Sequence, residues 1–107
     1  MDKTYEFITG MIQELNDLFP DTHIHLGGDE IEQDCFDENP GIQQYMTKMG
    51  IATYSELIVS HISKVRSMLK RMNSKKKAIY WSDPSTLYQK YGDGDILMYW
   101  GNCDNAT

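Results

Sequence analysis

Two carboxylates stand side by side at Asp29 and Glu30, directly after the glycine pair Gly27 and Gly28. At an effective dielectric near 20, two like charges ~5 Å apart repel by roughly 3 kcal/mol. Such a pair can divide two roles, because one member keeps a proton while its neighbour stays ionised. Cleavage of a glycosidic bond needs this division: the leaving oxygen takes a proton, and a negative group stabilises the oxocarbenium-like centre.

Tryptophans accompany the acidic pair at two later points of the chain. Trp81 precedes Ser82 and Asp83, and Trp100 closes another apolar run. Aromatic faces pack against sugar rings and exclude water from them. An isolated acidic pair in a loop usually only faces solvent, so the sugar-cleaving hypothesis depends on the fold bringing these residues together.

Apolar spacing predicts the elements that position these side chains. Apolar residues three and four apart indicate helices, and Asn39 before Pro40 and Thr53 before Glu56 are typical helix starts. Alternating or continuous apolar runs indicate strands. The expected helices are 2–19, 40–49 and 54–72, the expected strands are 22–27, 78–81 and 95–100, and 84–91 is a turn or short helix.

Strands that alternate with helices predict an α/β fold with right-handed crossovers and a parallel sheet, buried on both faces at its last two strands. The carboxyl ends of parallel strands share one edge, so both carboxylates and both tryptophans should meet at one mouth. Three strands leave both sheet edges unpaired. We therefore interpret residues 1–107 as part of a larger domain, about three of the eight βα units of a TIM barrel.

Composition argues against several partners. The net charge of −6 disfavours nucleic acid, whose phosphates require clustered cations. The cations at 70–71 and 75–77 lie where the longest predicted helix ends, where they favour the helix dipole and should be solvated. No apolar run approaches the ~20 residues of a membrane span, and no secretory leader is evident.

The string HLGGDE, from His25 to Glu30, resembles the signature of glycoside hydrolase family 20, the β-N-acetylhexosaminidases. Its flanks agree: a helix ends in Phe-Pro-Asp, Cys35 follows the acidic pair, Asn39 and Pro40 open a helix, and a later strand ends in Trp81. The resemblance covers essentially the whole chain. It implies the middle of the catalytic barrel, around strands four to six.

The resemblance also implies a mechanism and its residues. In this family the substrate's own 2-acetamido oxygen attacks the anomeric carbon, with retention of configuration and with no protein nucleophile, cofactor or metal. Asp29 would orient the acetamido group, and Glu30 would protonate the leaving oxygen and then activate water. The implied substrate contacts are Trp81, Trp100, Asp83 and His25.

Several expectations come from the family alone. The implied substrates are β-linked N-acetylglucosamine or N-acetylgalactosamine glycoconjugates. The expected localisation is lysosomal or secreted. The full-length protein is expected to form homo- or heterodimers. The chain also departs from the family. Phe36 stands where many members have tryptophan, Ser82 and Asp83 replace a common Gln-Glu pair, and Gly101 replaces a larger polar residue.

Three other interpretations remain open at this stage. His23, His25 and Asp29 share a strand parity and are candidate metal ligands, although no further ligand cluster accompanies them. The stretch 92–95, Gly-Asp-Gly-Asp, resembles a calcium loop but lacks the later ligands, which favours a turn. A truncated, catalytically silent carbohydrate-binding relative is the alternative to an enzyme, and the intact acidic pair and both tryptophans favour the enzyme.

Overall fold

The computed structural model describes residues 2–82 and 91–101. It has the predicted order of helices and strands, with the addition of the short helix α2, while residues 84–90 of the predicted turn or short helix lie outside the described part. None of the helices in that part combines the length and apolarity of a bilayer span. The elements are α1 (Asp2–Leu18), β1 (His23–His25), α2 (Asp34–Asp37), α3 (Pro40–Met49), α4 (Tyr54–Met72), β2 (Lys77–Trp81) and β3 (Ile96–Met98).

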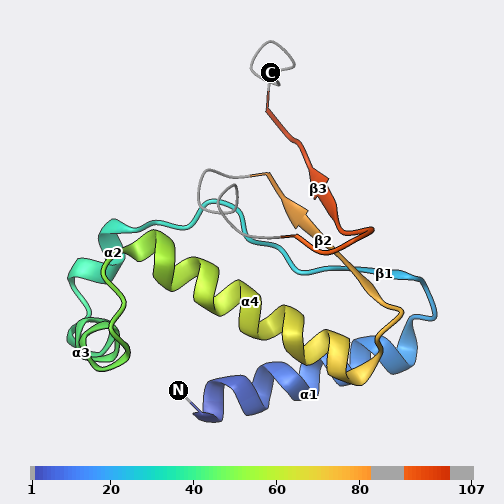
Figure 1. Ribbon diagram of the computed structural model, residues 1–107, viewed down its shortest axis with the longest axis horizontal. Coiled ribbons are helices and arrows are strands. Elements are labelled where there is room, and N and C mark those ends of the chain that lie inside the picture. Colours follow the sequence, from blue (N-terminus) through green and yellow to red (C-terminus); the bar gives the residue numbers. More distant parts are fainter. Residues whose placement is uncertain (1, 83–90, 102–107) are drawn as a thin grey trace.

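The three strands form one parallel sheet in the order β1-β2-β3, which confirms the predicted α/β architecture. Helices α1 and α4 lie side by side against one face of the sheet, and α2 and α3 lie near the beginning of α4 (Figure 1). The principal extents are 41 × 40 × 19 Å. The shortest extent matches one helix layer on one sheet layer.

The core lies between this helix pair and the central strand. Ala78 and Tyr80 of β2 are 0% and 1% exposed and pack with Leu69 of α4, which is 0% exposed. Burial alternates along β2, so Ala78 and Tyr80 face the helices while Trp81 faces the other side. The sheet therefore has a packed face and a second face that carries an aromatic side chain at its carboxyl end.

Local sequence signals place the helix ends where they were predicted. The Asn39 side chain accepts hydrogen bonds from the backbone N–H groups of Gly41 and Ile42, at 3.0 and 3.3 Å, and so caps α3. Gly50 ends α3 with a φ of 67°, the left-handed conformation that glycine adopts readily. Thr53 caps α4 by accepting from the N–H of Glu56 at 3.2 Å.

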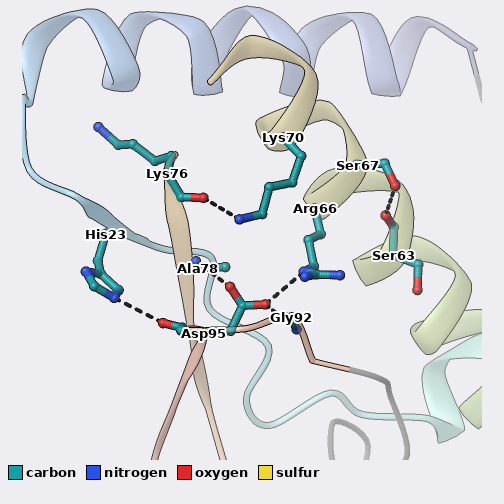
Figure 2. Close-up of polar contacts among 10 residues, drawn as sticks. His23, Ser63, Arg66, Ser67, Lys70, Lys76, Ala78, Gly92 and Asp95 are labelled. Carbon is teal, nitrogen blue, oxygen red and sulfur yellow. Dashed lines mark hydrogen bonds and ion pairs between the residues drawn. The ribbon is translucent and has the colours of Figure 1, made fainter. Parts of the chain in front are cut away.

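A buried carboxylate joins three elements at the amino ends of β2 and β3. The side chain of Asp95 is 0% exposed and accepts from the Arg66 Nε of α4 at 2.8 Å. It also accepts from the N–H of Gly92 at 2.8 Å and from the N–H of Ala78 at 3.0 Å (Figure 2). Asp95 thus anchors the turn before β3 to both β2 and α4. The predicted turn at 92–95 is confirmed, and its last carboxylate serves this anchor.

The surroundings of Asp95 also set its protonation. Burial by itself would raise the pKa of this carboxyl group. The N–H groups of Ala78 and Gly92 and the guanidinium of Arg66 outweigh burial and hold the pKa below its ordinary value. Because folding depresses this pKa, Asp95 stabilises the fold fully above its ordinary value of 3.8, and that stability is lost as the pH falls through the native pKa.

Two expectations about exposure are wrong. Lys76 is not solvated but 3% exposed, and its Nζ donates to the Phe19 carbonyl at 2.7 Å; only Lys70 and Arg71 lie in the last turn of α4, as expected for cations at a helix end. Strand β3 was expected to be buried on both faces, yet its residues are 37–43% exposed. The reason is that, within the described residues, no β3 side chain packs with the core cluster between the helices and the sheet.

We expect Asp95→Asn to lower the free energy of unfolding by about 3 kcal/mol, because it removes the charge that Arg66 and two backbone N–H groups satisfy in a buried site. Urea titration of the protein expressed from its complete reading frame measures this. The matched control is Asp93→Asn, an exposed aspartate two residues away.

The stability difference between Asp95→Asn and the parent should shrink below pH 3.8, as the native carboxylate becomes protonated. A difference at pH 7 no larger than that of Asp93→Asn would show that the anchor contributes nothing to stability.

Candidate active site

The chain turns sharply where β1 ends. The φ angles of Gly27, Gly28 and Glu30 are 76°, 96° and 49°, all in the left-handed region. Glycine adopts such angles readily, whereas a glutamate there costs about 1–2 kcal/mol. Strand alternation therefore stops after His25, and it no longer forces Asp29 and Glu30 onto opposite faces. This turn is the condition under which both carboxylates can share one mouth.

Main-chain bonds hold this turn against the neighbouring strand. The Trp81 N–H donates to the Gly27 carbonyl at 3.0 Å, and the Leu26 N–H donates to the Ile79 carbonyl at 2.9 Å. The pairing of β1 with β2 therefore continues past the last regular residue of β1. The first glycine of the pair is fixed beside Trp81.

The imidazole of His25 contacts both sides of this junction. Its Nδ1 accepts a hydrogen bond from the Gly27 N–H at 3.0 Å. Its ring lies against the indole of Trp81, with centroids 4.7 Å apart and planes tilted by 50°. A backbone N–H can only donate, so Nδ1 is the acceptor in this bond.

The carboxyl end of β3 is tied to that of β2. The Ser82 N–H donates to the Met98 carbonyl at 2.8 Å, and the indole Nε1 of Trp100 donates to the Ser82 carbonyl at 2.8 Å. Trp100 is 53% exposed, so much of the residue remains accessible. The segments that follow the three strands thus form one continuous edge, as the parallel sheet predicted.

Both carboxylates of the candidate pair are exposed. Asp29, Gly28 and His25 line a hollow of about 410 Å³, whose other lining residues are largely apolar side chains of α1 and α4. Glu30 is absent from that lining. Because Tyr80 and both helices line it, this hollow lies on the helix-facing side of the sheet, opposite the face that carries Trp81.

The structure brings part of the predicted site together. His25 contacts Trp81, and the segment after Trp81 holds Trp100. Asp83 lies outside the described residues. Sequence reasoning did not anticipate that the Ser82 carbonyl fixes Trp100. Every residue has a backbone carbonyl, so the residue type does not indicate which one accepts.

Two residues that the family comparison singled out, the departure Phe36 and the shared Cys35, also have a structural setting. Phe36 is half-buried, packs against the core cluster and meets the ring of Tyr54 edge-on, with centroids 5.2 Å apart. Cys35 is an exposed free thiol. Within the described ranges, no three side chains of the metal-ligating types gather at one point, so the His23, His25 and Asp29 hypothesis gains no support.

Comparison with known proteins identifies the family. Residues 1–107 match the family described as glycosyl hydrolase family 20, catalytic domain. The human β-hexosaminidase subunit beta is 36% identical over 101 residues, which cover 94% of this chain and 18% of that protein. The rat β-hexosaminidase subunit alpha is 29% identical over 100 residues, or 94% of this chain and 19% of the relative.

A solved structure shares the fold. The crystal structure of a GH20 exo-β-N-acetylglucosaminidase from Vibrio harveyi, in complex with N-acetylglucosamine, superposes with a TM-score of 0.79 at 24% sequence identity. It covers 95% of this chain, which corresponds to 16% of that enzyme. The chain thus spans about a fifth of the length of the curated relatives it matches. It belongs to glycosyl hydrolase family 20, and its residues correspond to part of that family's catalytic domain.

Proposed function

We propose that this chain carries the acid and the acetamido-orienting residue of a retaining β-N-acetylhexosaminidase. The observation that carries the proposal is the left-handed turn that follows β1 and bears Asp29 and Glu30, at the sheet edge where Trp81 ends β2 and Trp100 follows β3. Membership of a glycosidase family supports hydrolysis of hexosaminides as the reaction. The silent alternative has no specific observation in its favour.

The three parallel strands would be the fourth to sixth of an eight-stranded barrel. The open outer edges of β1 and β3 within the described residues support this, because a closed barrel pairs both edges. The exposed apolar side chains of α1, Phe7 at 69% and Leu18 at 72%, support further elements beside it. Active sites of such barrels lie at the carboxyl ends of the strands, where the acidic pair stands.

In the proposed first step, the acetamido oxygen of the substrate attacks its own anomeric carbon while Glu30 protonates the glycosidic oxygen. The bond from the anomeric carbon to that oxygen breaks, and a cyclic oxazolinium forms within the sugar. Asp29 accepts a hydrogen bond from the acetamido N–H and stabilises the positive charge that develops on the nitrogen. Glu30, now ionised, then takes a proton from water, whose oxygen attacks the anomeric carbon and displaces the acetamido oxygen, with overall retention.

Trp81, Trp100 and Asp83 are the proposed substrate contacts, the two indoles walling the acetamido group, and His25 lies against Trp81. The proposed substrates are glycoconjugates ending in a β-linked N-acetylglucosamine or N-acetylgalactosamine, and a lysosomal or secreted address and a homo- or heterodimer go with this proposal. The Vibrio harveyi enzyme was solved with N-acetylglucosamine, which supports an amide-bearing sugar as ligand.

Glu30→Gln should lower kcat on a nitrophenyl β-N-acetylglucosaminide by roughly 10²–10⁴-fold, because an amide can neither give nor take the proton. The loss should be larger for an alkyl glycoside, whose leaving group needs protonation more. The matched control is Glu32→Gln, an exposed glutamate two residues on. Equal activity of Glu30→Gln and the control would remove Glu30 from the reaction.

Replacing the substrate's acetyl group by trifluoroacetyl should slow the parent enzyme, because the fluorinated carbonyl oxygen is a weaker nucleophile. Asp29→Asn should lower kcat on the natural acetamide by roughly 10²–10³-fold, the scale of losing one electrostatic partner of a developing charge. Steady-state kinetics with both substrates and both proteins measure this. A rate independent of the acyl group would exclude attack by the acetamido oxygen.

The 107-residue chain alone should show no turnover, because its described sheet has two unpaired edges and β3 is exposed. The assay uses the chromogenic N-acetylglucosaminide, with the same chain carrying Glu30→Gln as its control. Turnover above that control would show that these residues suffice for a working site.

A further inference from the structure

One imidazole holds two parts of the candidate site. His25 Nδ1 accepts from the Gly27 N–H at 3.0 Å, and the same ring lies 4.7 Å from the Trp81 indole, centroid to centroid. Gly27 opens the turn that carries the acidic pair. We propose that His25 is a positioning residue that couples the placement of this turn to the placement of Trp81. This inference rests on the proposed function of the acidic pair and of Trp81.

The backbone explains why a single side chain can act on both. The Gly27 carbonyl accepts from the Trp81 N–H at 3.0 Å, so the two residues are neighbours across the β1–β2 pair. His25 lies opposite Ile79 in the parallel register, two residues before Trp81 and on the same face of the sheet. Its ring therefore links strand β1 and the glycine turn to the indole of Trp81 on strand β2.

The turn needs this support because its geometry is unfavourable by itself. Gly27 and Gly28 have the largest conformational freedom to lose, and Glu30 adopts a left-handed φ of 49°. The Gly27 N–H bonds to a side chain, His25 Nδ1, rather than to a neighbouring strand. Without that acceptor the Gly27 N–H would lose this bond, and the placement of Glu30 would be less well defined.

The two contacts can be removed one at a time. His25→Asn keeps an acceptor in the place of Nδ1, through Oδ1, but loses the ring against Trp81. His25→Phe keeps a ring against Trp81 but has no acceptor for the Gly27 N–H. The matched controls are His23→Asn and His23→Phe on the same strand, since His23 contacts Thr22 and the Gly94 carbonyl, away from the turn.

We expect the two variants to affect different kinetic constants in the protein expressed from its complete reading frame. His25→Asn should raise KM roughly threefold to tenfold, because a loosened indole weakens binding of substrate and transition state alike, and should leave kcat near the parent value. His25→Phe should lower kcat roughly tenfold at nearly unchanged KM, because a displaced turn misplaces the acid in the transition state. Both His23 variants should behave as the parent.

A spectroscopic measurement tests the coupling without any activity. Protein labelled with 5-fluorotryptophan gives a ¹⁹F signal for Trp81, assigned by its loss in Trp81→Phe. A soluble paramagnetic agent should relax this signal more strongly in His25→Asn than in the parent, and His25→Phe should resemble the parent. If His25→Phe does not fold, His25→Asn alone still decides, since selective exposure of Trp81 with kcat retained is specific to the proposal.

The outcomes separate the two hypotheses. A parent that hydrolyses no N-acetylhexosaminide would overturn the proposed function, and the ¹⁹F comparison would still support or overturn the positioning role. If both His25 variants raise KM equally with no change at Trp81, His25 binds the sugar directly and the inference is wrong. It is equally wrong if His25→Asn leaves both KM and the Trp81 signal unchanged.

Discussion

His25 pairs with Ile79 across β1 and β2, and β2 continues in the same parallel sense to β3. This shared direction is the constraint on which the site depends, because it brings every strand's carboxyl end to one edge. The acidic pair, Trp81 and Trp100 are distant in sequence but follow three adjacent strands. No specific long-range contact between their side chains is needed to gather them.

The anchoring charge and the candidate chemistry lie at opposite ends of the sheet. Asp95 is bonded to Arg66, Ala78 and Gly92 before β3 begins, and both of its carboxylate oxygens accept hydrogen bonds that fix backbone and helix. Asp29 and Glu30 lie beyond the other end and are exposed. Rigidity is therefore supplied at the amino ends of the strands, and groups able to meet a ligand remain accessible at the carboxyl ends.

The sequence predicted most of the architecture because its signals are local. Asn39, Gly50 and Thr53 mark helix ends through their own side chains or backbone freedom, and the structure has helix ends at each. The direction of the sheet followed from the order of helices and strands. Asp95 was missed as an anchor because its partners, apart from Gly92, come from α4 and β2, far along the chain.

The site was predicted in its residues but not in its connections. The glycine pair indicated a turn, yet nothing in residue type showed that Glu30 itself adopts a left-handed φ, or that His25 faces Trp81. The exposure of β3 was also not predicted, because the apolar sequence of a strand is the same whether or not another element covers it. These features depend on tertiary placement, which spacing along one chain does not encode.

The register that pairs His23 with Lys77 also has a consequence for the order of synthesis. At about 5–20 residues per second, a ribosome completes β1 several seconds before β2 exists to pair with it. A strand of three residues, in which histidines flank one isoleucine, offers little to a neighbouring nascent chain during that wait. The shortness of β1 thus suits a strand whose partner β2 is synthesised only after α4.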